Sequence, residues 1–478
     1  MNAPHHRGAH RRALFILVVG GWAALGLTAP VLPRLGAQDK STPKAPGKYL
    51  GATGCDGAQC HNKPEAAEHP PYLQEYLSWS SMNEDGLPYD RHFYAWKRLR
   101  GSDMGGDDRS PEIMAKLNEL EGTNEQAELS ERCLTCHGVA VHDYGVGKAN
   151  PGAAVAKYKP LQGARYKNEE GVSCDGCHGP ASNWLKKHDK KDWTIKEWEK
   201  LGGKNGGSEK LYDTHGIYYS KDLELWADQC VRCHLKIDTN MLDAGHPDLL
   251  PFELFGHNKQ VPHWRDYSYF EPAPHLPGAG PSHAAISWAV GQAVTVRSAA
   301  EQLQDRATGA HHNQATPEHL AGAVTRLASH WLALKAGLKV LQPAAVDPID
   351  QAVAPILSGT PEAAACAEVA KKVVELVKPL ARKLADGQVD KGQVSAIMKA
   401  LVNDEQAYAD APRAELLMKS LYALDYARLM HTNPDDLVAD EPADPVMQAV
   451  YEMYGSPDPS TAEFQAALKK ARDTLAKE

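Results

Sequence analysis

The sequence predicts a mostly α-helical protein with few strands, divided near residue 282 into two parts that differ in composition. Residues 49–281 contain eight of the nine cysteines and are rich in Gly, Pro, Trp and Tyr, with little regular periodicity. Residues 282–478 are instead dominated by Ala, Leu, Val, Lys and Glu at helical spacing. We therefore expect an irregular first domain followed by an antiparallel, bundle-like helical domain.

Residues 1–37 have the features of a secretion signal. Three arginines before residue 13 form a basic region, residues 13–29 are apolar, and Ala37 ends a small-residue cleavage site. This apolar run is short for a membrane span, which needs about 20 residues. We expect a periplasmic or otherwise exported protein, anchored in a membrane only if the leader is not cleaved. Residues 38–48 then form a flexible tether.

Two cysteines followed directly by a histidine occur four times in the first part. Three copies have the form C-x-x-C-H, which is typical of c-type haem attachment, and the first copy is a wider C-x4-C-H variant. In such motifs both thiols bond to the haem as thioethers, and the histidine binds the iron as proximal ligand. The sequence therefore predicts four covalently attached haem c groups. The attachment residues are Cys55, Cys60 and His61; Cys133, Cys136 and His137; Cys174, Cys177 and His178; and Cys230, Cys233 and His234.

Two other uses of paired cysteines stay open at this point. Zinc sites combine C-x-x-C pairs with histidines, but they do not require a histidine directly after each second cysteine. Disulfides suit an exported protein but leave the four adjacent histidines unexplained. The wider Cys55–Cys60 pair keeps a disulfide or another non-haem role as its alternative. Cys366 has no partner motif, and we expect it to be a small buried residue of a helix.

Only short helices are expected in the first part, between the motifs. Its composition fits a haem-templated multihaem cytochrome domain, in which the porphyrins supply much of the apolar core. Gly202–Gly207 is predicted to be a loop because four of its six residues are glycine. The expected helices are Pro71–Ser81, Arg91–Leu99, Ser110–Leu120 and Trp193–Leu201.

The second part shows the apolar spacing of amphipathic helices, with Pro, Gly or Asp at the breaks. It contains no haem motif and no fixed repeat. Its sequence therefore predicts a helical fold but indicates no catalytic or binding function. The expected helices are Ala284–Gln304, Pro317–Leu341, Pro361–Asp386, Lys391–Asn403, Ala411–His431, Pro445–Tyr454 and Ser460–Lys477.

Further histidines are needed if the irons are bound from both sides. An iron held between two histidines has no vacancy for a substrate, so it carries electrons and does not activate ligands. Four proximal histidines then require up to four distal ones. The first part offers more than enough, and counting alone does not assign them: His69, His92, His142, His188, His215, His246, His257, His263 and His275.

The first part resembles the cytochrome c-554 family of tetrahaem cytochromes, which accept electrons from hydroxylamine oxidoreductase in nitrifying bacteria. The resemblance lies mainly in Gly171-Val-Ser-Cys174-Asp-Gly-Cys177-His178-Gly-Pro180, followed by Trp184 and His188-Asp189. The second and fourth motifs lie at similar distances on either side. Asp90-Arg91-His92 follows the first motif much as a His-Ala segment does in that family. The resemblance covers about residues 50–240.

Carried over residue by residue, the resemblance implies His188 as distal ligand of the first haem and His92 of the third. His246 is then the candidate for the fourth. The second haem of that family is five-coordinate, and His142 is the nearest alternative ligand here. The chain departs from the family in its widened first motif and in the local context of His246.

These features favour an exported tetrahaem cytochrome that transfers electrons between redox partner proteins, whose donor and acceptor the sequence does not name. The alternative is a haem enzyme that acts on nitric oxide, hydroxylamine or nitrite at an open iron. The formal net charge of −9 becomes about −13 without the leader, which carries four arginines and no acids (−9 minus 4). An acidic surface disfavours nucleic acid and suits a basic redox partner. Membrane association is expected only through the N-terminal segment.

Overall fold

The prediction of a mostly α-helical protein is confirmed. The described residues form helices joined by turns and loops, and they contain no β-sheet; an isolated bridge joins Ala273 and Leu276. The structure is a computed structural model, and no helix in its described part is long and apolar enough to cross a membrane. It describes residues 47–57, 60–63, 74–84, 86, 89–101, 109–139, 163, 165–248, 251–271, 273–276, 278–309, 315–357, 362–437, 444–455 and 457–478.

The first part consists of short helices, as expected. The predictions for 110–120 and 193–201 are confirmed, whereas the helix expected over 91–99 is wrong, because two 3-10 turns occupy that stretch. The helices are η1 (Ala52–Gly54), α1 (Glu75–Ser80), η2 (Arg91–Tyr94), η3 (Lys97–Arg100), α2 (Ser110–Glu121), α3 (Glu131–His137), η5 (Asn168–Glu170), α5 (Cys174–His178), η6 (Ala181–Asn183), α6 (Trp193–Lys200), α7 (Gly207–His215), α8 (Leu223–His234), α9 (Thr239–Asp243), α10 (Leu254–Lys259) and η7 (Tyr267–Tyr269).

The second part consists of longer helices. They are α11 (His283–Thr308), α12 (Pro317–Leu341), η8 (Pro343–Ala345), α13 (Val346–Val353), η9 (Ala354–Ile356), α14 (Ala363–Val377), α15 (Leu380–Ala385), α16 (Lys391–Asn403), η10 (Glu405–Tyr408), α17 (Ala411–Met430), η11 (Pro434–Leu437), α18 (Pro445–Gly455) and α19 (Ala462–Leu475). Two expectations need correction. The single helix expected over 361–386 is two helices, because Pro379 has no N–H to continue the first one. Helix α13 was not expected at all.

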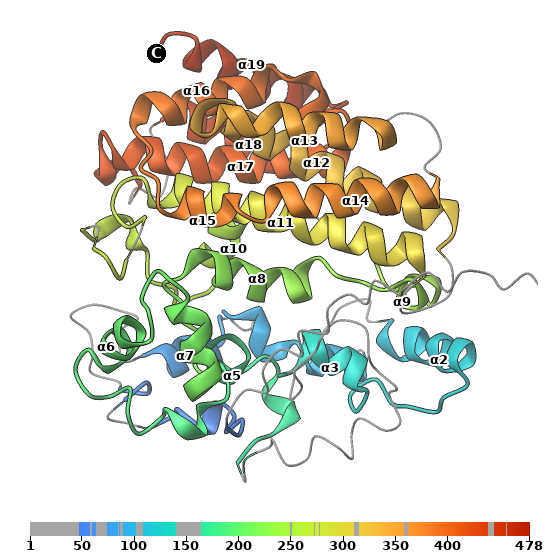
Figure 1. Cartoon of the computed structure of the whole chain (residues 1–478), viewed down its shortest axis with the longest axis vertical. Coiled ribbons are helices and arrows are strands. Elements are labelled where there is room, and N and C mark those ends of the chain that lie inside the picture. Colours follow the sequence, from blue (N-terminus) through green and yellow to red (C-terminus); the bar gives the residue numbers. More distant parts are fainter. Residues whose placement is uncertain are drawn as a thin grey trace, which may run out of the picture. The chain divides into compact units, whose positions relative to one another are not determined.

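Helix α11 is the centre of the second part. It packs against α12, α14, α15 and α17, and on another side against α8 of the first part. In Figure 1 it lies, in yellow, between green α8 and the orange helices. Twenty-one of its residues are buried, so the apolar pattern runs around most of its circumference, as in a helix enclosed by others.

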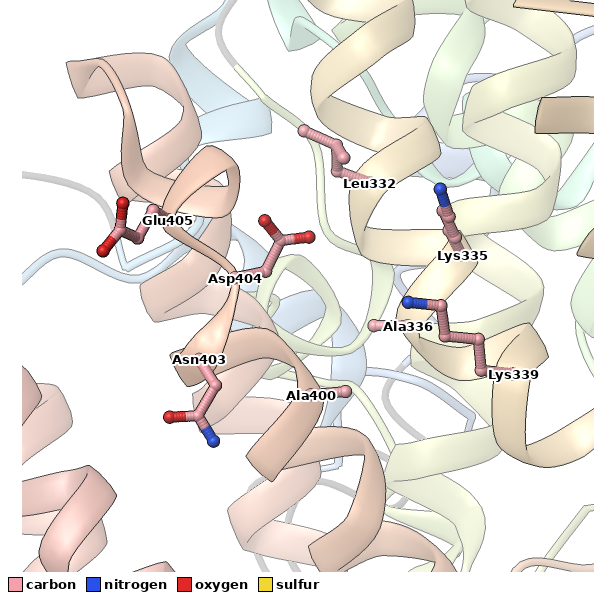
Figure 2. Close-up of a pocket in the computed structure, with 8 residues that line it drawn as sticks. All are labelled: Leu332, Lys335, Ala336, Lys339, Ala400, Asn403, Asp404 and Glu405. Carbon is pink, nitrogen blue, oxygen red and sulfur yellow. The ribbon is translucent and has the colours of Figure 1, made fainter. Parts of the chain in front are cut away.

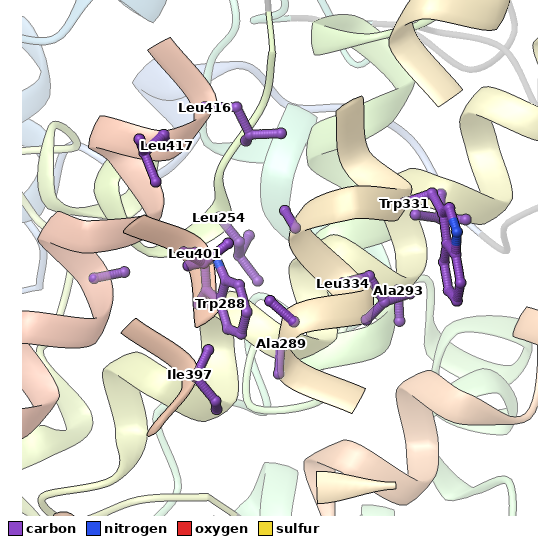
Figure 3. Packing of buried hydrophobic residues seen from close by; sticks show 14 of the residues in the cluster. Leu254, Trp288, Ala289, Ala293, Trp331, Leu334, Ile397, Leu401, Leu416 and Leu417 are labelled. Carbon is purple, nitrogen blue, oxygen red and sulfur yellow. The ribbon is translucent and has the colours of Figure 1, made fainter. Parts of the chain in front are cut away.

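The hydrophobic core is continuous through the second part and reaches into the first. Trp288 of α11 and Trp331 of α12 are completely buried in it, and Leu223 and Val231 of α8 belong to the same cluster. Figure 3 shows Trp288 together with Ile397 and Leu401 of α16. Cys366 is fully buried in α14, as expected.

Partly buried ion pairs also join residues of the two parts. Arg306 of α11 donates from both terminal nitrogens to Asp248, at 3.0 and 3.2 Å, and Arg297 donates to Glu224 of α8 at 3.0 Å. The contacts of residues 41–478 make them one compact unit. The expected boundary between residues 281 and 282 stays a prediction, and so do the leader and most of the tether, since residues 1–46 lie outside the described part.

Candidate haem-attachment sites

Three of the four motifs share one local structure, in which a helix ends at the histidine. Helices α3, α5 and α8 stop at His137, His178 and His234. A spacing of three residues puts the two cysteines of each motif on the same helix face, one turn apart. A glycine follows the helix in two cases, and Gly179 has φ 82°, a conformation that suits glycine. Each of these helices therefore presents two thiols and an imidazole at its carboxyl end.

The first motif is built differently. Cys55 follows the short turn η1, and Cys60 and His61 lie in a further turn, with residues 58–59 outside the described part. The His61 carbonyl accepts a hydrogen bond from the Tyr76 N–H at 2.9 Å, which fixes this turn against α1. The widened spacing is thus accommodated without a helix through the motif.

The motifs lie together in pairs, the first with the third and the second with the fourth. Asp175, inside the third motif, accepts hydrogen bonds from the N–H groups of Leu50 and Gly51 at 2.8 and 2.7 Å. The Cys174 thiol is hydrogen-bonded to Cys55, and this contact, together with burial, raises its pKa. The first and third motifs are therefore held side by side.

The second and fourth motifs meet in the same way. The Cys136 thiol is hydrogen-bonded to Cys233, and this contact, together with burial, raises the pKa of Cys136 well above its ordinary value. The Cys233 sulfur also lies 3.4 Å from the Thr135 carbonyl oxygen. Helices α3 and α8 are in contact, so two attachment sites again share one neighbourhood.

All nine cysteines are free thiols, including Cys55 and Cys60. Burial raises the pKa of Cys133 to about 11 and that of Cys177 to about 12. A zinc site needs thiolates, which such surroundings disfavour. Within the described ranges, no three or more side chains of His, Cys, Asp and Glu are grouped so as to hold a metal ion by themselves.

Several histidines are oriented as metal-bound histidines usually are. When Nδ1 donates its hydrogen to an oxygen, Nε2 carries the lone pair that an iron requires. Six rings of the first part have this arrangement, and in four of them the oxygen is a backbone carbonyl, which can only accept; His283 and His330 of the second part share it. The six are His61 (Glu75 Oε2, 2.9 Å), His92 (Asp90 Oδ1, 2.9 Å), His137 (Ala95 O, 3.0 Å), His188 (Leu185 O, 2.7 Å), His246 (Pro247 O, 2.8 Å) and His257 (Glu253 O, 2.7 Å).

Two pairs of histidine rings have the separation of axial ligands. Imidazoles on opposite sides of one metal ion, each about 2 Å from it, have centroids about 6 Å apart. The rings of His61 and His188 are 5.9 Å apart and nearly parallel, at 7°. Those of His92 and His234 are 6.2 Å apart and perpendicular, at 88°. The first pair is the one expected from the sequence for the first haem.

The other expected ligands lie in different neighbourhoods. His92 lies beside His234 of the fourth motif, whereas the resemblance assigned it to the third. His246 comes two residues after Ala244, which packs in one hydrophobic cluster with Cys133 of the second motif. His142 lies outside the described residues. The pairings stay predictions, and this geometry favours the fourth motif for His92 and the second for His246.

Sequence reasoning left His263 unassigned. This ring is partly buried, and after burial of His178 itself it is the largest influence that lowers the pKa of His178, to about 4. Its Nδ1 lies 3.9 Å from Asp90 Oδ2 and has no hydrogen-bond partner among the described residues. A signal was present in the sequence, since Pro262-His263-Trp264 lies within the first part, but nothing there indicated which motif it approaches.

The surroundings fit a haem. Burial lowers the pKa of His178 and of His234 to about 4, so both rings are neutral at pH 7, as a metal ligand must be. Three buried N–H groups of Trp and Asn side chains in the first part have no hydrogen-bond partner in the described structure, and carboxylate groups such as haem propionates would satisfy them. They are Trp184 Nε1, Trp264 Nε1 and Asn258 Nδ2.

A surface pocket of about 320 Å³ lies elsewhere, in the second part. Figure 2 shows Lys335 and Lys339 of α12 on one wall and Asn403 and Asp404 on the other. Lys335 is already paired with Asp350 at 2.7 Å. None of the residues lining the pocket belongs to a motif, so it is not a candidate haem site.

No protein-family model, curated protein or solved structure matches this chain significantly.

Proposed function

We propose that this protein is an exported tetrahaem c-type cytochrome that carries electrons between redox partner proteins. One observation carries the proposal. All four Cys–Cys–His motifs have free thiols. In two of the motifs, a second histidine ring lies at the distance from the motif histidine that two axial ligands of one iron would have. Haem bound between two histidines supplies one-electron transfer without an open site for a substrate.

The histidine neighbourhoods suggest a ligand set for all four irons. His61 with His188 serves the first haem, and His234 with His92 the fourth, on ring separations of 5.9 and 6.2 Å. This revises the expectation that His92 serves the third haem and His246 the fourth.

For the remaining irons we propose His137 with His246 for the second haem and His178 with His263 for the third. The first pair rests on the cluster that Ala244 shares with Cys133, and the second on the electrostatic influence of His263, which lowers the pKa of His178. A complete bis-histidine set favours an electron carrier over an enzyme with a vacant iron.

The pairing of motifs explains how electrons would cross the protein. Thiol contacts between Cys55 and Cys174, and between Cys136 and Cys233, bring the attachment sites together two by two. His92 then connects the pairs, since its ring lies beside His234 while its backbone carbonyl accepts the Val172 N–H of the third-motif segment at 2.9 Å. Short separations between successive haems are what an electron carrier needs.

The helical second part has a supporting role in this proposal. Helix α11 packs along α8, which ends at the proximal histidine of the fourth motif. Three arginines of the second part bind carboxylates of the first: Arg297 with Glu224, Arg306 with Asp248 and Arg382 with Asp222. The second part thereby covers one side of the haem region and fixes the position of α8.

The experiment that tests the proposal combines haem quantification with electron paramagnetic resonance of the ferric protein. We expect four haems per chain, all low-spin. A matched variant with Cys133→Ser and Cys136→Ser loses one haem, whereas Cys366→Ser, outside the motifs, loses none. A chain without covalent haem refutes the proposal. Three low-spin haems and one high-spin haem would instead support the enzyme, and nitric oxide and hydroxylamine would then be tested as ligands.

A further inference from the structure

We propose that the exposed turn Lys186–Lys191, over the first haem site, is the docking surface for an acidic redox protein. This inference rests on the proposed electron-transfer function, because it names where a partner binds. Lys186, Lys187, Lys190 and Lys191 are all exposed, and His188 lies between them.

The turn has a fixed shape. The N–H groups of Lys187 and His188 both donate to the Trp184 carbonyl, at 2.8 and 3.1 Å, and the Trp193 N–H donates to the Lys190 carbonyl at 2.9 Å. Trp184 is buried beneath the turn, with its ring 5.2 Å from that of His188. The lysines are therefore held at the surface around His188, which faces His61 at 5.9 Å.

The local charge is opposite to that of the chain. Residues 186–192 carry four lysines and two aspartates, a net charge of +2 (4 minus 2), whereas the chain as a whole carries −9. The exposed Lys48 lies next to the segment that leads into this turn, since its backbone N–H donates to Ser182 Oγ at 2.7 Å. A basic patch on an acidic protein attracts and orients an acidic partner.

These lysines also differ from many others on the surface. Lys469 is paired with Asp473, Lys470 with Glu452 and Lys200 with Glu197. The four lysines of the turn have no ion pair with any described residue, and the Lys187 ammonium group lies 5.9 Å from the centre of the Trp193 ring. Asp189 and Asp192 lie among these lysines, yet the local net charge stays positive. The turn therefore presents four exposed ammonium groups beside the first haem site to a negatively charged partner.

The test compares two fourfold Lys→Glu variants with the same change in net charge. The docking variant changes Lys186, Lys187, Lys190 and Lys191. The control variant changes four exposed lysines of the second part, Lys371, Lys372, Lys378 and Lys383. Haem content and absorption spectra are measured first, and both variants should match the wild type.

Two probes then examine the surface. A decaglutamate peptide is titrated by calorimetry at low ionic strength, where exposed charges are least screened. In stopped flow, the dithionite-reduced protein gives one electron to hexacyanoferrate(III), so that haem Fe(II) becomes Fe(III) and the anion becomes hexacyanoferrate(II). A cationic cobalt(III) phenanthroline complex serves as the oxidant of opposite charge.

We expect the docking variant to bind the peptide about tenfold more weakly than the wild type and to be oxidised by hexacyanoferrate(III) about tenfold more slowly. Its oxidation by the cationic cobalt(III) complex should become faster. The control variant should stay within about twofold of the wild type. Equal effects in both variants, or none in either, overturn the docking surface. Wild-type protein that binds the peptide but carries no haem would refute the proposed function and leave the surface itself supported.

Discussion

Gly291 of α11 and Leu254 of α10 lie so close that a Cβ at position 291 would be 2.6 Å from the Leu254 Cβ. Glycine inside a long helix is normally unfavourable. Here it lets α10, which belongs to the first part, lie directly on α11. This contact fixes the segment that contains His257.

Gly291→Ala should therefore destabilise the protein by about 1–3 kcal/mol, since either helix must shift to admit the methyl group. Urea unfolding followed by circular dichroism measures the change. Gly455→Ala is the matched control, because a methyl group on that helical glycine would have no neighbouring atom within 4 Å, and alanine favours the helix. Equal stability of Gly291→Ala and wild type would show that α10 is not tightly packed there.

The partly buried ion pair between Arg306 and Asp248 should link the two parts. Arg306→Met leaves the Asp248 carboxylate, which is 32% exposed, paired with Arg326, and we expect a loss of about 1–2 kcal/mol. Differential scanning calorimetry measures it. Lys469→Met, at an exposed ion pair, should leave the transition unchanged. A similarly small effect of Arg306→Met would mean that the parts are joined by apolar packing alone.

His330 should make the protein sensitive to acid. It is fully buried in α12, with Nδ1 at 2.8 Å from Gln292 Oε1, and burial lowers its pKa to about 3. The folded state keeps this ring neutral, whereas the unfolded chain takes up a proton below its ordinary pKa of 6.5. Stability is therefore complete above about pH 6.5 and falls as the pH drops towards 3.

His330→Gln should remove this contribution, which amounts to about 2 kcal/mol at pH 5. The free energy of unfolding is measured at pH 7.5 and pH 5 for both proteins. We expect the wild type to lose more stability than the variant between the two values. His319→Gln, in the first turn of α12 beside Asp243, is the control for loss of a histidine from the same helix. Parallel losses in wild type and His330→Gln would contradict the prediction.

The proposed ligands His92 and His263 should serve different irons. Each single substitution to alanine is expected to convert one low-spin haem to high-spin, because a distal ligand is removed while the thioethers remain. The double variant should then contain two high-spin haems by electron paramagnetic resonance. If it contains only one, the two histidines share an iron, and the third and fourth haems need another assignment. His275→Ala is the control and should leave all haems low-spin.

The long helices of the second part were the most predictable elements. α16 runs over Lys391–Asn403, as expected, and α12 over Pro317–Leu341. Their sequences combine apolar spacing with N-cap residues, and Asp390 and Thr316 both form capping boxes. The break at Pro379 was missed because the apolar pattern continues across it, although the missing N–H of proline ends α14.

The attachment residues could be predicted, but their partners could not. Each C-x-x-C-H motif is local in sequence, and the histidine that ends α3, α5 or α8 follows directly from it. A distal ligand is fixed by tertiary structure instead. His92 is held beside His234 by tertiary contacts: Asp90 Oδ1 accepts from its Nδ1 at 2.9 Å, and its backbone carbonyl accepts the Val172 N–H at 2.9 Å. The spacing of His92 and His234 along the chain does not indicate that the two rings lie side by side.

The carboxyl end of α8 has a consequence for the order in which the irons accept electrons. The peptide dipoles of this twelve-residue helix add up to a partial negative charge at the end where His234 lies. Negative charge beside an iron stabilises its ferric form. His61 follows turns and has no such helix behind it. We therefore expect the fourth haem to have a lower midpoint potential than the first. Electrons would then move from the fourth haem to the first, which lies beside the lysine-rich turn.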